Sequence, residues 1–177
     1  MRFVETAIMG AFVVDLVPHA DARGSFARVY CETAFAEAGI DFRPVQVNLS
    51  RNPLPFTLRG MHYQHAPHGE AKYVQCVAGR LFDVAVDLRP GSPSYLASVG
   101  VELAAGENRL FYIPEGCAHG YLTLEADSAL HYQVSHPYVA EAGAGVRWDD
   151  PAFAIQWPAV PQVINPRDAG YPDYRPG

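Results

Sequence analysis

The chain has 177 residues, a length typical of one domain, and we expect a single domain over residues 1–177. Its 13 Lys and Arg against 19 Asp and Glu give a net charge of −6, which argues against the basic surface that non-specific nucleic-acid binding requires. Apolar residues make up 49% of the chain and charged residues 18%, and this composition excludes a disordered protein.

The beginning of the chain lacks the features of an exported or membrane protein. Residues 1–5 contain no apolar stretch like that of a signal peptide, and the apolar run at 7–14 is too short to span a bilayer. Three cysteines, Cys31, Cys76 and Cys117, form no CxxC motif and leave an odd number, which favours a reduced intracellular protein. We therefore expect a cytoplasmic protein with no membrane partner.

The elements predicted along the chain are mainly short strands. One helix is expected at 32–38, ended by Gly39. The stretch 72–89 reads as a hairpin that turns near Ala78-Gly79, because its second half alternates apolar and polar residues. The remaining strands are expected at 12–17, 45–50, 58–64, 109–113, 120–124 and 129–134. The last 30 residues contain six prolines and should follow the surface irregularly. Many short strands of this kind predict an all-β sandwich, jelly roll or barrel.

Lys72 is the only lysine, and the other twelve cationic residues are arginine. Alternate side chains of a strand share a face, so Lys72 would share one with Val74 and Cys76. An ammonium group is costly to bury unless another group compensates it. Two interpretations stay open: Lys72 stands at the end of the strand and reaches water, or it faces an interior site.

Two other side chains also break an apolar pattern. Tyr132 shares a face with Leu130 and Val134, although a tyrosine in a core is common. His62 shares a face with Leu58, and a lone histidine in such a place is more often structural than catalytic. Considered singly, both residues fit an ordinary structural role.

The same residues suggest a site when they are considered together. One barrel interior could be lined by Gln46, Asn48, His62, Gln64, Lys72 and Tyr132. A barrel mouth with a few convergent polar groups is the usual place for a small-molecule site.

Two segments resemble the paired motifs of cupins, which are small β-barrels that often hold a metal ion. They are the histidine-rich stretch 62–70 and the Pro-x-Gly-x-x-His arrangement at 114–119. Metal-binding cupins usually have His-x-His in the first motif, whereas here the second position is Gln64, a poor ligand for a transition metal. The ammonium of Lys72 would also repel a cation. We therefore expect no metal and no other cofactor. The alternative is a metal-dependent cupin enzyme using His62, Glu70 and His119.

Short motifs also follow one another in a characteristic order over nearly the whole chain. They are Asp21-Ala-Arg23-Gly24-Ser-Phe26, Gln46-Val-Asn48-Leu-Ser50, Leu58-Arg59-Gly60-Met-His62-Tyr63-Gln64, Ala71-Lys72, Phe82-Asp-Val-Ala-Val-Asp87-Leu-Arg89, Ser92-Pro93, Ile113-Pro114, Ala118-His119-Gly120, Trp148-Asp-Asp150-Pro151, Trp157-Pro158 and Arg167-Asp168. In this order they resemble the nucleotide-sugar 3,5-epimerases of the dTDP-4-dehydrorhamnose type. The resemblance implies a cupin-type jelly roll (double-stranded β-helix) with a few short helices, a homodimer, and a reaction that needs no metal.

The resemblance further implies an epimerase of deoxysugar biosynthesis that acts on a 4-keto-6-deoxyhexose carried by a nucleoside diphosphate. Protons at C3 and C5 of such a sugar are acidic because the C4 ketone takes up charge as an enolate. His62 matches the family's base, and Asp168 matches the carboxylate that orients it. Tyr132 matches the acid on the opposite face of the ring, and Lys72 matches the cation that stabilises the enolate oxygen.

The substrate contacts are implied in the same way. Arg59 and Arg23 match residues that bind the diphosphate, and Arg23 and Phe26 would reach the partner subunit's site through strand exchange. Strict alternation puts Arg59 on the opposite face to His62, and a bulge at Gly60 would bring them together. Other substrate contacts are matched by Gln46, Asn48, His119, Tyr138 and Arg167.

Two departures from the family pattern leave the substrate open. Arg28 stands where the family usually has a glutamate that helps to read thymine, so a nucleotide other than dTDP is an alternative. Leu49 stands where a histidine is common. The sequence does not decide between epimerisation at C3 alone and at both C3 and C5. A 3-epimerase or sugar ketoisomerase and a non-catalytic binding module also remain alternatives.

Overall fold

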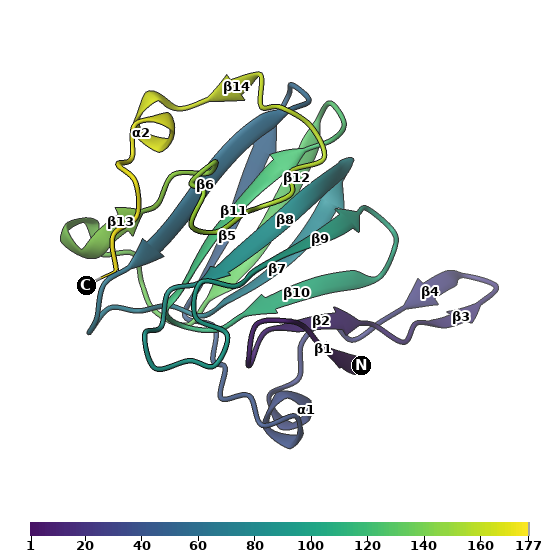
Figure 1. The fold of residues 1–177 in the computed structure, drawn as a ribbon. Helices are drawn as coiled ribbons and strands as arrows, with labels where there is room; N and C mark the ends of the chain where they lie inside the picture. The colour runs from purple at the N-terminus through teal and green to yellow at the C-terminus, as the bar shows by residue number, and fades with distance from the viewer. Residues whose placement is uncertain (177) are drawn as a thin grey trace.

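Two β-sheets packed face to face make up most of the molecule, and the computed structural model describes residues 1–176 (Figure 1). Sheet I contains, in spatial order, β1 (Arg2–Glu5), β2 (Phe12–Asp15), β10 (Arg109–Ile113), β7 (Lys72–Ala78), β12 (Ser128–Val134) and β5 (Gln46–Asn52). Sheet II contains β13 (Gly143–Gly145), β6 (Thr57–Gln64), β11 (Cys117–Thr123), β8 (Arg80–Asp87) and β9 (Ser98–Ala104), with β14 (Val163–Ile164) beside β6. This architecture confirms the predicted cupin-type jelly roll.

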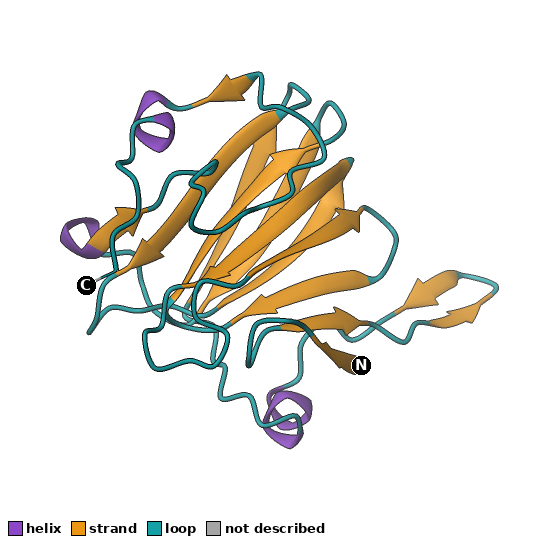
Figure 2. Ribbon diagram, in the orientation of Figure 1, coloured by secondary structure: helices purple, strands orange, loops and turns teal. Residues whose placement is uncertain are grey.

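The helices are short and lie outside the sheets (Figure 2). They are α1 (Glu32–Glu37), a 3₁₀ turn at Ala140–Ala142, and α2 (Pro166–Ala169). Within residues 1–176, no helix has the length and apolar character needed to cross a membrane. The predicted helix at 32–38 is confirmed to within a residue, and Gly39 follows it with a φ of +77°.

The space between the two sheets is filled by alternate side chains of their strands. Val74 and Cys76 of β7 and Leu130 of β12 meet Leu81 and Ala85 of β8 in one buried cluster. The intervening residues of β7 face the other way, where Tyr73 packs with Phe35 of α1 and with Phe42. Both faces of β7 are therefore covered, which explains its nearly continuous apolar sequence.

Most of the predicted strands are confirmed, but the hairpin at 72–89 is wrong. The chain does turn at Gly79, with a φ of +64°, and a Cβ there would lie 2.4 Å from Ser128 Oγ. However, β7 pairs with β10 and β12, whereas β8 pairs with β9 and β11, so the turn carries the chain from sheet I to sheet II. Two consecutive apolar strands joined by a tight turn have the same sequence pattern whether they pair in one sheet or lie in two facing sheets. The sequence also did not predict β1, β3, β4, β9, β13 and β14.

The surface has a projecting ribbon and an uncovered apolar row. The ribbon formed by β3 (His19–Asp21) and β4 (Gly24–Phe26) projects away from the sheets, and every residue in both strands is exposed (Figure 1). The outer face of sheet I is covered near α1 but not along β5, where Val47 and Leu49 are 59% and 49% exposed. Residues 148–176 are largely irregular, as predicted, apart from β14 and α2.

Candidate active site

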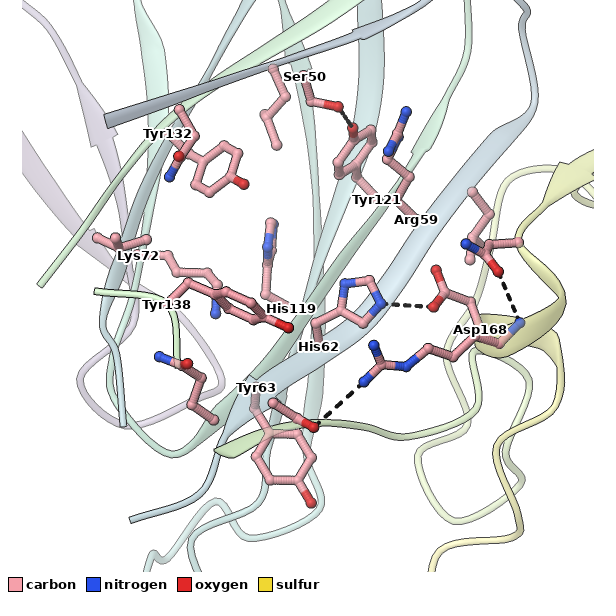
Figure 3. Close-up of a pocket in the computed structure, with 18 of the residues that line it drawn as sticks. Ser50, Arg59, His62, Tyr63, Lys72, His119, Tyr121, Tyr132, Tyr138 and Asp168 are labelled. Carbon is pink, nitrogen blue, oxygen red and sulfur yellow. Dashed lines mark hydrogen bonds and ion pairs between the residues drawn. The ribbon is translucent and has the colours of Figure 1, made fainter. Parts of the chain in front are cut away.

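A cavity of about 820 Å³ opens between the sheets and is closed on one side by the C-terminal segment (Figure 3). Both sheets contribute polar side chains to its walls. All the predicted site residues line it except Arg23 and Phe26: Gln46, Asn48, Arg59, His62, Lys72, His119, Tyr132, Tyr138, Arg167 and Asp168. Sequence reasoning therefore located the cavity, although residues up to 122 positions apart meet in it.

His62 and Asp168 form a hydrogen-bonded pair at the edge of the cavity. His62 Nε2 lies 2.8 Å from Asp168 Oδ1, and the Gly60 amide donates to Asp168 Oδ2 over 3.1 Å. Asp168 is delivered by α2, a short helix that Asn165 caps by accepting a hydrogen bond from the Arg167 amide. Burial opposes ionisation, but the bonds with His62 and Gly60 lower the pKa of Asp168 below its usual value. With Nε2 held by a carboxylate, Nδ1 of His62 faces the cavity (Figure 3).

A bulge in β6 brings Arg59 and His62 to the same cavity. His119 of β11 pairs with His62, yet Tyr121 pairs with Arg59, so β6 has one extra residue between the two pairs. Gly60 supplies it, with a φ of +128° and no room for a side chain, because a Cβ would lie 2.5 Å from Gly120 Cα. The predicted bulge at Gly60 is thus confirmed, and it resolves the conflict between Arg59 and strict alternation.

Lys72 is buried, and the interpretation that it reaches water is wrong. Its side chain is 6% exposed because β7 lies between β10 and β12, which puts even its first residue inside the sheet. Its ammonium lies 2.6 Å from Glu70 Oε1, and no other side chain is paired with it among the described residues. An ammonium with one carboxylate partner and an open cavity beside it is a cation available to a ligand.

Tyr132 faces His62 across the cavity, since β12 belongs to sheet I and β6 to sheet II (Figure 3). Burial, with smaller contributions from Tyr121 and Glu70, raises the pKa of Tyr132 above its usual value. The phenol is therefore protonated at neutral pH and can donate a proton. A base and an acid on opposite walls can act on the two faces of one bound ring.

A second histidine–carboxylate pair stands at the wall of the same cavity, which His119 lines. His119 Nε2 is 2.9 Å and 3.0 Å from the two oxygens of Asp83, whose side chain is completely buried. Burial raises the pKa of Asp83 even though His119 and Lys72 favour its ionised form. Sequence reasoning missed Asp83, because its position in the alternation of β8 looked like that of an ordinary surface residue. What marks Asp83 is its pairing with the fully buried strand β11, which the sequence alone does not show.

The residues at the cavity mouth are held less tightly. Gln46 donates to Asn48 Oδ1 over 2.8 Å, and Arg59 Nε donates to Asn52 Oδ1 over the same distance. Tyr138 is 60% exposed. Asn52 is buried and was not predicted. Of the Arg59 nitrogens it accepts only from Nε, so the two terminal nitrogens of the guanidinium stay available to an anion.

Arg23 and Phe26 lie on the β3–β4 ribbon and do not line the cavity of their own chain. Arg23 pairs with Asp21 over 2.6 Å in an exposed turn, and Phe26 is 69% exposed. A large apolar side chain and a cation on a projecting ribbon are available to a second molecule, and the contribution of both residues to a partner's site stays a prediction.

The side chains of the alternative metal site are engaged elsewhere. His62 Nε2 faces Asp168, Glu70 pairs with Lys72, and His119 Nε2 faces Asp83. In residues 1–176, no three His, Cys, Asp or Glu side chains are grouped so that they could hold a metal ion. The three cysteines are free thiols. These donors do not fit a metal, and the absence of a cofactor stays a prediction.

The sequence and the fold of this chain are both similar to those of known proteins of one family. A family model described as dTDP-4-dehydrorhamnose 3,5-epimerase matches residues 5–175. A dTDP-4-dehydrorhamnose 3,5-epimerase of Sinorhizobium fredii is 42% identical over 153 residues, which cover 86% of this chain and 78% of the relative. A dTDP-4-dehydrorhamnose 3-epimerase of Streptomyces niveus is 39% identical over 95% of this chain and 81% of its own length. The crystal structure of the Bacillus anthracis 3,5-epimerase with TDP and PPi bound superimposes with a TM-score of 0.93 and 32% identity, over 98% of this chain and 99% of that one.

Proposed function

The chain belongs to the dTDP-4-dehydrorhamnose 3,5-epimerase family, and from this premise we propose a metal-free mechanism for it. It is an epimerase, an enzyme of the isomerase class, and acts on a dTDP-sugar as a 3,5- or 3-epimerase in deoxysugar biosynthesis. We propose that residues 1–177 act as one domain on a nucleoside-diphosphate 4-keto-6-deoxyhexose. The observation that carries the mechanism is the placement of a His–Asp pair and a protonated tyrosine on facing walls, with Lys72 on the same wall as the tyrosine.

The first step is removal of the proton at C3 by His62 Nδ1. The imidazole is suited to this because Asp168 stabilises the positive charge that it acquires. The lowered pKa of Asp168 keeps that carboxylate ionised during turnover. Electrons of the broken C–H bond move into the C3–C4 bond, and the C4 carbonyl oxygen becomes an enolate oxygen.

Lys72 stabilises the enolate oxygen in this proposal. A buried ammonium in a site that excludes water acts strongly on a developing negative charge, and the loss of such a group typically lowers the rate by about 10²–10³-fold. The charge of Glu70 compensates Lys72 before substrate binds, so the empty site does not hold an unpaired buried cation.

Tyr132 returns a proton to the opposite face of the ring, which inverts the carbon. Its raised pKa favours the protonated form that this step needs. The same two groups act at C5 if the sugar turns within the cavity or if both C–H bonds face the base in sequence. Proton exchange at C3 alone, or at both C3 and C5, distinguishes inversion of one centre from inversion of two.

The remaining cavity residues bind the substrate in this proposal. Arg59 contacts the diphosphate, since its guanidinium offers two parallel donors to phosphate oxygens. Contacts to the sugar and nucleotide come from Gln46, Asn48, His119, Tyr138 and Arg167. A cytoplasmic location agrees with the three free thiols but stays a prediction.

We propose that the enzyme is a homodimer in which Arg23 and Phe26 complete the partner's site. The support is the exposed β3–β4 ribbon, which carries both residues away from its own chain, and the uncovered apolar row at Val45, Val47 and Leu49 (Figure 1). Light scattering should give the mass of a dimer. A monomeric protein with full activity would contradict strand exchange.

The experiment that tests the function is proton NMR in deuterated water with 4-keto-6-deoxy sugars on dTDP, UDP, CDP and GDP. We expect loss of the C3 proton signal, alone or with that of C5, for one of these substrates. The panel also shows whether Arg28 accompanies a change of nucleotide. A native protein that exchanges no proton of any of the four sugars would contradict the proposal.

A further inference from the structure

Gln64 is a buried carboxamide at the end of β6, and both ends of its side chain are bonded. The residue is 5% exposed. Its Oε1 accepts a hydrogen bond from the Val139 amide over 2.6 Å. Its Nε2 lies 3.0 Å from the His68 carbonyl, 3.2 Å from the Pro137 carbonyl and 3.2 Å from Glu70 Oε2. A buried carboxamide is tolerated when its donors and acceptor are used in this way.

One of the segments bonded to Gln64 leads to the buried lysine. Glu70 uses one oxygen for Gln64 and the other for Lys72, whose ammonium lies 2.6 Å from Glu70 Oε1. No hydrogen bond of good geometry holds the Lys72 ammonium in the described residues. The place of the cation therefore depends on where Glu70 is, and Glu70 depends on Gln64.

The other bonded segment carries Tyr138 at the cavity mouth. Gln64 contacts the residues on both sides of it, the Pro137 carbonyl and the Val139 amide. The amide of Tyr138 itself donates only a long hydrogen bond of 3.4 Å to Gln46 Oε1. Gln64 thus fixes a backbone whose side chain faces solvent and the cavity.

We propose that Gln64 is a positioning residue, which sets the Lys72 ammonium through Glu70 and the Tyr138 side chain through the Pro137–Val139 backbone. The effect on catalysis rests on the proposed function, whereas the effect on Lys72 does not. Only a carboxamide can accept from an amide at one end and donate to carbonyls and a carboxylate at the other. A carboxylate would lack the donors, and an apolar side chain would lack both.

The single lysine of the chain makes this proposal testable without any ligand. Protein labelled with carbon-13 only in lysine gives one Cε signal, and that signal belongs to Lys72. We expect it to move in Gln64→Met and in Gln64→Glu, because Glu70 shifts in both variants. It should coincide with the native signal in the matched control Gln156→Glu, which changes an exposed glutamine that does not line the cavity. An unchanged signal in a folded Gln64 variant would overturn the proposal, and either variant suffices if the other fails to fold.

The pH dependence of proton exchange gives a readout that a merely structural role would not change. Gln64→Glu puts a second carboxylate 3.2 Å from Glu70, and two like charges at that distance raise the pKa of one of them. The protonated form has an O–H that can donate to its neighbour, so kcat of Gln64→Glu should recover as the pH falls. Gln64→Met has no such group and should stay about 10–10²-fold below native at every pH, as expected for a misplaced catalytic cation. Parallel pH profiles for the two variants would contradict the proposal.

The two proposals fail in different ways. A native protein that exchanges no sugar proton would refute the epimerase mechanism, and the lysine signal would still decide whether Gln64 positions Lys72. A native protein that exchanges normally, together with a Gln64→Met variant of native kcat and KM, would refute the positioning role alone. If Gln64 acts through Glu70, Gln64→Met should lower kcat much less in a Glu70→Gln background than in native protein.

Discussion

The two histidine–carboxylate pairs of the cavity contain the same groups in opposite environments. His62 and His119 are paired across neighbouring strands, and each faces a carboxylate through Nε2. His62 is 47% exposed and its partner comes from a helix outside the sheets, whereas His119 is 8% exposed and its partner lies inside β8. The pKa of Asp168 is lowered by its hydrogen bonds, and that of Asp83 is raised by burial.

This difference indicates which pair can carry a proton through a reaction cycle. A base must gain a positive charge and lose it again, and Asp168 stays ionised to stabilise that charge near water. The Asp83 pair is closed off from water, so a change of charge there would be costly. We infer that His62–Asp168 performs chemistry, whereas His119–Asp83 holds a ring in place against the substrate.

Replacement of the two histidines should give the largest contrast. His62→Ala should lower C3 proton exchange by about 10²–10⁴-fold, because the general base is lost. His119→Ala should act mainly on KM, by about tenfold, which corresponds to one substrate hydrogen bond of about 1–1.5 kcal/mol. The measurement is deuterium uptake at a series of substrate concentrations. Equal losses of kcat in the two variants would show that both pairs take part in the chemistry.

Removal of the two carboxylates should separate activity from stability. Asp83→Ala leaves the His119 Nε2 group buried without a partner, and this should cost about 1–3 kcal/mol of unfolding free energy. Asp168→Ala should cost less, because water can reach the half-exposed His62, yet it should lower kcat more. Urea unfolding and exchange kinetics measure the two effects. The comparison fails if Asp168→Ala is the more unstable and the more active variant.

Sequence reasoning identified the first pair and missed the second for a physical reason. His62 and Asp168 lie 106 residues apart, and only the resemblance of ordered motifs linked them. Short strands and frequent turns predicted a sandwich, jelly roll or barrel, and the resemblance selected the cupin-type jelly roll. Polar residues that interrupt apolar faces indicated only part of the site, and the resemblance supplied the rest. Asp83 gave no such interruption, because alternating Asp83, Ala85 and Asp87 resemble a strand with one exposed face.

The same limit explains the misread hairpin. Alternation indicates which residues share a face of a strand, but it does not indicate which strands pair. Sheet I covers the face of β8 that carries Asp83, and this became visible only once β7 and β8 were assigned to different sheets. Asn52 was not predicted, and Glu70 was considered only as a metal ligand; in the structure they contact the predicted residues Arg59 and Lys72.

The pH dependence of stability should show the smallest effect, with opposite signs for the two carboxylates. The folded-state pKa of Asp168 lies below its usual value of 3.8, so Asp168 contributes stability that is present above that value and is lost as the pH falls through the folded-state pKa. The stability difference between native protein and Asp168→Asn should therefore shrink in acid.

The folded-state pKa of Asp83 lies above 3.8, so the native state binds more protons than the unfolded state there and loses stability as the pH rises through that range. Asparagine resembles a protonated aspartate, and Asp83→Asn should thus gain stability relative to native protein as the pH rises. Urea unfolding of the three proteins from acid to neutral pH measures both differences, and differences that change in the same direction would remove the distinction between the two pairs.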